Sequence, residues 1–106
     1  MAVVEVFRAL GDPYRLEMIK RLATGNPYTI NTVSKGLEIT RQGARKHLQI
    51  LAEADLIVLQ TQGRDKRVLL NQTRLAECKT FVAEIELQWE QRLEALRRVV
   101  EGNPPN

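Results

Sequence analysis

Residues that could ligate a metal or form a disulfide are scarce in this chain: its 106 residues include one cysteine, Cys78, and one histidine, His47. A single cysteine cannot form a disulfide within the chain, and one cysteine with one histidine gives no cluster of soft metal ligands. There is no second histidine to serve as a base and no glycine-rich phosphate-binding loop. We therefore expect no metal, no cofactor and no enzymatic activity.

Long apolar segments are missing as well. No apolar run approaches the ~20 residues that span a bilayer, and the first residues, Met1 to Glu5, lack the pattern of a signal peptide. The length suits one domain with a small core, to which oligomerisation would add buried surface. We expect a cytoplasmic protein of one domain with no membrane partner.

The positive charge of the chain is small but concentrated. The formal net charge is +3, yet the stretch from Lys35 to Arg67 holds seven basic residues against four acidic ones, and the remainder is balanced. A surplus confined to one third of a small chain is expected of a surface that binds nucleic acid.

Residues 40–51 predict a helix that buries only one side, with Thr40 as its N-cap. On a helical period, one narrow stripe holds Ala44, Leu48, Leu51 and Asp55. The opposite face holds Gln42, Arg45, Lys46 and Gln49. Arginine and glutamine can contact base edges in the major groove, and lysine and arginine neutralise phosphates. The alternative is the solvated face of an ordinary amphipathic helix.

Other helices are expected on both sides of this one. A first helix covers residues 3–10 and stops at Gly11. A second, capped by Asp12 with Pro13 at its first position, runs to about Ala23. Its inward residues are expected to be Leu16, Ile19 and Leu22. A short third helix is expected from about Asn31 or Thr32 to Gly36, with Val33 and Leu37 buried. That short helix, the turn at 36–40 and the helix that follows have the dimensions of a helix-turn-helix.

A basic hairpin is predicted after these helices. Residues 56–62 and 66–70 read as strands, and Gly63, Arg64 and Asp65 form the tip, where glycine allows a positive φ. A hairpin beside a recognition helix is a wing, and Arg64, Lys66 and Arg67 could follow the DNA backbone or enter the minor groove. The fold class is therefore mainly α with a small β-hairpin.

These segments together resemble the ArsR-type winged helix-turn-helix transcriptional regulators of bacteria and archaea. The segment from Phe7 to Ile19 is similar to the opening of that family, and the segment from Thr40 to Ile57 is similar to its recognition helix and the following turn. The resemblance covers about residues 5–72. It implies a homodimer that binds double-stranded DNA at an inverted repeat, most simply as a repressor. The DNA-contacting residues would be Thr40, Arg41, Gln42, Arg45, Lys46, Gln49, Arg64, Lys66 and Arg67.

The chain also departs from the family at named positions. The Cys-x-Cys pair of many metal-sensing members is replaced by residues 29–34, and the last helix has no histidine. Metal sensing through either site is therefore not expected. Asp55 stands where the family usually has glycine, in a position that tends to be left-handed and that aspartate tolerates.

The last helix, over about residues 73–101, is too long to serve only as a lid on this core. Its apolar stripe consists of Leu75, Cys78, Val82, Ile85, Trp89, Leu93, Leu96 and Val100. We expect this stripe to pair with the first helix and with a twofold mate; packing within the monomer is the alternative. The expected dimer interface contains Val3, Phe7, Val82, Ile85, Trp89, Leu93 and Leu96. The chain thus divides into a DNA-binding core (3–72), a dimerisation helix (73–101) and a flexible tail (102–106).

Several alternatives stay open at the level of sequence. The winged helix could be a protein-interaction module without DNA affinity. His47 suits packing or a phosphate contact, Cys78 suits a small buried hydrophobe or a redox role, and Gly43 suits close approach to a phosphate or to the preceding helix. The operator, the regulated genes, the direction of regulation and any small-molecule or protein effector do not follow from the sequence.

Overall fold

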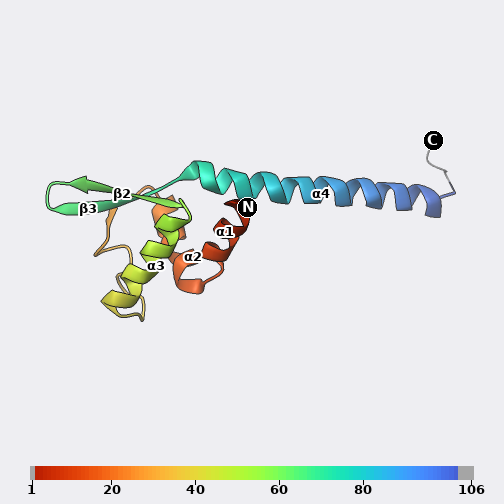
Figure 1. Cartoon of the computed structure of the whole chain (residues 1–106). Helices are drawn as coiled ribbons and strands as arrows, with labels where there is room; N and C mark the ends of the chain where they lie inside the picture. The colour runs from red at the N-terminus through yellow and green to blue at the C-terminus, as the bar shows by residue number, and fades with distance from the viewer. Residues whose placement is uncertain (1, 103–106) are drawn as a thin grey trace.

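Four helices and a three-stranded antiparallel sheet make up the structure, a computed structural model in which residues 2–102 are described. The elements are α1 (Ala2–Leu10), α2 (Pro13–Ala23), β1 (Tyr28–Thr29), α3 (Arg41–Glu53), β2 (Ile57–Gln62), β3 (Asp65–Leu70) and α4 (Gln72–Val100). Helices α1 to α3 gather into a body, from which the β2–β3 hairpin and α4 extend in opposite directions (Figure 1). The molecule is therefore elongated, 68 × 26 × 26 Å. The expected fold class is confirmed; the expected tail lies outside the described residues beyond Gly102.

Helix α2 begins and ends where its sequence predicts, but one inward residue was predicted wrongly. Asp12 caps it, with Oδ1 accepting from the backbone N–H groups of Tyr14 (2.8 Å) and Arg15 (3.1 Å). The buried face contains Met18, Ile19 and Leu22, whereas Leu16 is 46% exposed. Leu16 lies about 200° around the helix from Met18, because successive residues turn by about 100°. The core therefore takes Met18 in place of Leu16.

The predicted short helix at 31–36 is wrong: the chain forms a series of turns there. Thr29 and Thr32 bond to each other's backbone, since Thr32 Oγ1 accepts from Thr29 N at 2.8 Å and Thr29 Oγ1 accepts from Thr32 N at 3.3 Å. Such local side-chain bonds compete with helical ones, and β-branched residues have low helix propensity. Arg21 of α2 holds the segment by donating from Nη1 to the carbonyls of Val33 (3.0 Å) and Lys35 (2.7 Å). Val33 is fully buried as expected.

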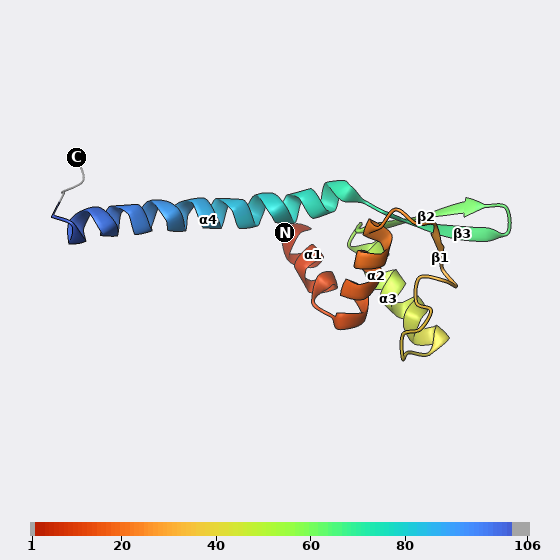
Figure 2. The ribbon, with the colours of Figure 1, turned by 180° about the vertical axis from the view of Figure 1, so that it is seen from behind.

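The sheet has the order β1-β3-β2. The short strand β1 was not predicted; it pairs with β3 through Tyr28 opposite Val68 and Thr29 opposite Arg67, and lies beside it in the view from behind (Figure 2). The hairpin turn has two residues rather than the expected three, because Gln62 pairs with Asp65. Gly63 has φ 64° and Arg64 a negative φ, as a two-residue type II′ turn requires. Asp65 thus belongs to β3.

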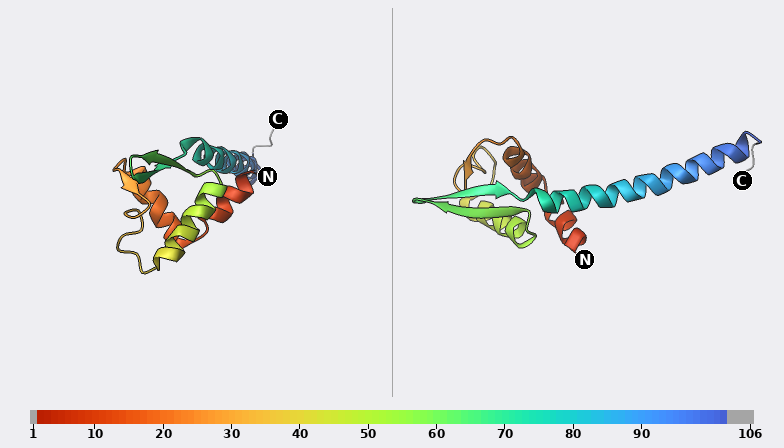
Figure 3. Two further views of the ribbon diagram at one scale, coloured as in Figure 1. Left: turned by 60° about the vertical axis from the view of Figure 1, so that its left-hand side comes forward. Right: turned by 90° about the horizontal axis from the view of Figure 1, so that it is seen from above.

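Only the first turns of α4 belong to the core. Leu75 and Cys78 pack against it, whereas every residue from Lys79 to Val100 is exposed. Figure 3, seen from above, shows the rest of α4 leaving the body with a gentle curve. Packing within the monomer therefore accounts for the first part of the apolar stripe and not for the part from Val82 onward. Within residues 2–102, no helix is both long and apolar enough to cross a membrane.

Candidate nucleic-acid interface

Helix α3 presents the face that the sequence predicted. Thr40 caps it, with Oγ1 accepting from Gly43 N at 2.9 Å. Ala44, Leu48 and Leu51 are buried in the core. The exposed side chains of the predicted reading face are Gln42, Arg45, Lys46 and Gln49. The burial of one face fixes the helix on the body, and the other face is free to enter a groove. Asp55, which the helical period places on the same stripe, lies beyond the end of α3 at Glu53, and its side chain is 64% exposed.

The first turn of α3 explains the unusual glycine in this helix. A Cβ at Gly43 would lie 3.1 Å from Thr40 Oγ1, the atom that caps the helix. This contact is tighter than the spacing that side chains usually keep, so a larger residue would crowd the cap. No atom of residues 2–39 is found within 4 Å of that position, so the expected close approach to the preceding helix is wrong, whereas the approach to a phosphate stays a prediction. Thr40 and Arg41 are exposed beside the free N–H groups of this helix end, where an anion is favoured.

A hollow of about 540 Å³ separates α3 from the wing. Arg45 and Gln49 line it from α3, and Arg64 and Lys66 line it from the hairpin. Residues predicted from two separate motifs therefore border one concave surface. Because side chains alternate along a strand, Arg67 points to the other face of the sheet from Lys66. Arg67 instead borders a second hollow with Leu22 and Tyr28, so the structure does not bring it together with the other wing residues.

Thr29, Ile30 and Asn31 also border the first hollow, although their sequence did not predict them as site residues. They belong to β1 and the turns that follow, a segment that was predicted as loop and helix. The pairing of β1 with β3 places them there. The sequence signal of that pairing was weak: residues 28–30 are tyrosine, threonine and isoleucine, types that are enriched in strands, and residues 66–70 already read as a strand.

His47 packs behind the reading face instead of pointing to the groove. Its Nδ1 lies 3.0 Å from Nη1 of Arg15 and 3.9 Å from Oδ1 of Asp12. Because arginine can only donate, Nδ1 accepts this bond in the neutral form of the imidazole, whose proton then lies on Nε2. Arg15 also donates from Nε to the carbonyl of Ala9 at 2.5 Å. The cluster thus joins α1, α2 and α3, and His47 has the packing role.

The pKa of Asp12 is lowered in this cluster. Burial acts in the opposite direction, but the backbone N–H groups of Arg15 and Tyr14 and the nearby charges of His47 and Arg15 outweigh it. The ionised carboxylate is therefore the form that caps α2.

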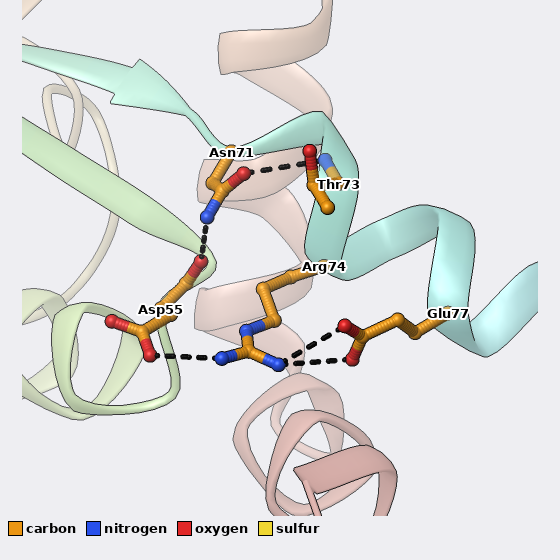
Figure 4. A network of polar contacts seen from close by, with 5 residues as sticks. All are labelled: Asp55, Asn71, Thr73, Arg74 and Glu77. Carbon is orange, nitrogen blue, oxygen red and sulfur yellow. Dashed lines mark hydrogen bonds and ion pairs between the residues drawn. The ribbon is translucent and has the colours of Figure 1, made fainter.

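The end of α3 is tied to the start of α4 by a polar network (Figure 4). Asp55 has φ 58°, the left-handed conformation expected of it. Its carbonyl accepts from Asn71 Nδ2 at 2.8 Å, and its Oδ2 accepts from Arg74 Nη2 at 3.2 Å. Arg74 Nη1 also donates to both carboxylate oxygens of Glu77, at 3.1 and 3.0 Å. The hydrogen bonds and charge of Glu77, followed by those of Asp55, raise the pKa of Arg74.

Cys78 lies in the core, where burial and then the charge of Glu77 raise the pKa of its thiol. It behaves as the small buried hydrophobe that was one of the two expectations. Across residues 2–102, no three side chains of the histidine, cysteine, aspartate and glutamate types come close enough together to hold a metal ion.

Known proteins are similar to this chain in sequence and in fold. The helix-turn-helix domain family matches residues 10–60. YuzN of Bacillus subtilis (strain 168), an HTH-type transcriptional regulator, is 33% identical over 72 residues, a match that covers 62% of this chain and 78% of YuzN. An ArsR-like transcriptional regulator from Rhodococcus sp. RHA1 has a similar structure, with a TM-score of 0.78, 26% identity and 92% of each chain covered. A homodimeric winged helix-turn-helix DNA-binding domain from Mycobacterium bovis shares the fold at 18% identity, with a TM-score of 0.62, 88% of this chain and 82% of that chain covered.

Proposed function

Because this chain belongs to the ArsR-type winged helix-turn-helix family of transcriptional regulators, we propose that it binds an inverted-repeat operator as a homodimer and acts as a repressor in the cytoplasm. The observation that carries the proposal is the shared hollow. Arg45 and Gln49 approach it from α3, and Arg64 and Lys66 approach it from the wing. One duplex can engage both elements at once.

The reading face of α3 supplies the base contacts in this proposal. Arginine and glutamine form bidentate bonds to guanine and adenine respectively, so Arg45 and Gln42 are the residues best suited to discriminate bases. Gln49 Nε2 already donates to Glu53 Oε1 at 3.2 Å, so it must exchange that bond to reach a base. Lys46, Arg64 and Lys66, with Thr40 and Arg41 at the helix end, supply phosphate contacts.

The exposed stripe of α4 supports the dimer. Ile85, Trp89, Leu93 and Leu96 are each between 44% and 56% exposed in a single chain. Exposed apolar surface of this extent marks an interface, and the M. bovis domain with the same fold is a homodimer. A twofold axis through α4 would place the two α3 helices on successive major grooves, about 34 Å apart on B-DNA. In this scheme residues 3–72 bind DNA and residues 73–101 join the subunits.

Selection from a random duplex library, at 50 and 200 mM salt, tests the proposal. We expect the purified protein to enrich an inverted repeat and its affinity to fall by orders of magnitude between the two salts. Lys79→Ala is the control, because it removes an exposed charge from α4 outside the hollow. Absence of any enriched sequence would contradict the proposal and favour a protein-interaction module on this scaffold.

A further inference from the structure

The position of α3 relative to α4 depends on a contact that the proposed DNA surface does not use. Asp55 follows the end of α3 by two residues, and Arg74 lies in the first turn of α4. Their side chains meet at 3.2 Å (Figure 4), and neither lines the hollow that Arg45 and Arg64 border. We infer that this contact sets the spacing between the two half-sites that the dimer recognises, so that Asp55 and Arg74 are positioning residues. The inference rests on the proposed function.

The network joins the two elements at three points. Asn71, the single residue between β3 and α4, caps α4 through Oδ1 and donates from Nδ2 to the carbonyl of Asp55. The backbone N–H of Asn71 donates to the carbonyl of Leu56 at 2.8 Å. The third bond joins Arg74 of α4 to Asp55 in the turn after α3. Of the three, it is the one made by two charged side chains. Leu75 and Cys78 pack the start of α4 on the core, and the Asp55–Arg74 pair adds a polar restraint on the angle at which α4 leaves the junction.

That angle has a large effect at a distance. Helix α4 has 29 residues and is about 43 Å long at 1.5 Å per residue, so a tilt of about 10° at its first turn moves its far end by about 7 Å. One base-pair step is about 3.4 Å. A dimer joined through the exposed part of α4 therefore holds its two recognition helices at a spacing that depends on this junction.

The Asp55–Arg74 contact is expected to affect the orientation of α4 more than the free energy of unfolding. The Asp55 side chain is 64% exposed, and exposed ion pairs contribute little to folding. Two hydrogen bonds to Glu77 on the same helix hold the guanidinium of Arg74 in place beside Asp55. Loss of the Asp55 contact leaves the core intact and removes the polar restraint on the angle of α4.

The test compares binding to inverted repeats whose half-sites are one base pair closer, at the selected spacing, and one or two base pairs further apart. The variants are Arg74→Ala and Asp55→Asn, because asparagine also tolerates the left-handed conformation of Asp55. Lys79→Ala is the control, because it removes an exposed charge from α4 and leaves Asp55, Arg74 and Glu77 unchanged. Circular dichroism and sedimentation check that each variant is folded and dimeric.

For both variants we expect the affinity ratio between the selected and the shifted spacings to fall by roughly two- to fivefold, with binding to an isolated half-site unchanged. Lys79→Ala should keep the wild-type ratio. A wild-type ratio in Arg74→Ala and Asp55→Asn would overturn the inference and leave the proposed function standing. If the wild-type protein binds all spacings equally well, both this inference and the proposed function are contradicted.

Discussion

Phe7 of α1 and Phe81 of α4 pack edge to face, with ring centroids 5.8 Å apart and ring planes inclined by 63°. Such aromatic pairs are favourable beyond the area that they bury. Each ring is still 38% exposed, so a single chain covers only part of the junction between α1 and α4. The uncovered side continues along α4 into the stripe that contains Val82, Ile85 and Trp89.

Trp89→Glu should therefore convert the proposed dimer into a monomer, because it places a charge in the middle of that stripe. Leu87→Glu is a closely matched control: Leu87 and Trp89 are 55% and 56% exposed, but Leu87 lies about 160° around the helix from Trp89. Sedimentation velocity measures the result. If Trp89→Glu sediments like the wild type, or if both variants dissociate, the stripe is not the interface.

Arg45 and Lys66 border the same hollow from different elements. Truncating each side chain should have a different effect on DNA binding. Arg45→Ala should cost about 1 to 3 kcal/mol in binding and relax the preference at one operator position, because a base loses its partner. Lys66→Ala should weaken binding to all sequences about equally and lower the salt dependence. Quantitative binding to a library of operator variants separates the two patterns. A uniform loss in both variants would contradict the assignment of Arg45 to a base.

Much of the fold could be predicted because local signals agree with the tertiary structure. Asp12 and Pro13 start α2 where they were expected to, Thr40 caps α3, and Gly63 takes the positive φ of the hairpin turn. The family and the exposed face of α3 also follow from the sequence. Each of these features depends on residues within four positions along the chain, and a sequence pattern reflects such local interactions.

Most of the failures have the opposite cause. The turns at 31–36 replace a helix because Thr29 and Thr32 bond locally and Arg21, from another element, holds the carbonyls of Val33 and Lys35. Strand β1 exists because β3 is beside it, and Asp55 meets Arg74 across 19 positions of sequence. Arg67 was grouped with Lys66 by its charge although the strand sends the two to opposite faces. Contacts between separate elements decided strand β1, the Asp55–Arg74 pair and the place of the turns at 31–36, and composition carries no record of them. The opposite directions of Lys66 and Arg67 follow from strand alternation and could have been predicted.

Gly43 and Thr40 should be energetically coupled. Thr40→Ala should lower the free energy of unfolding by about 1 kcal/mol, because Gly43 N loses its acceptor. Gly43→Ala should gain little in the wild type, since the new Cβ would lie 3.1 Å from Thr40 Oγ1. In the Thr40→Ala background the same change should recover most of the ~1 kcal/mol by which alanine exceeds glycine in a helix. Urea unfolding of the four proteins at one concentration gives the coupling, and strict additivity would show that the cap does not constrain Gly43.

Asp12 should make the stability of the protein depend on pH in the acid range. Its pKa is lowered in the folded state, because the backbone bonds from Arg15 and Tyr14 and the nearby positive charges outweigh the effect of burial. A group with a lowered folded pKa stabilises the protein above its unfolded pKa, about 3.9 for aspartate, and loses that contribution as the pH falls through the folded value.

Asp12→Asn keeps an N-cap but removes the charge. The wild type should therefore be more stable than Asp12→Asn at pH 7, and the difference should shrink below about pH 4. Urea unfolding of both proteins from pH 7 to pH 2.5, at one protein concentration, measures the difference. A difference that is unchanged at pH 2.5 would mean that the carboxylate charge does not contribute, and that the cap acts through its geometry alone.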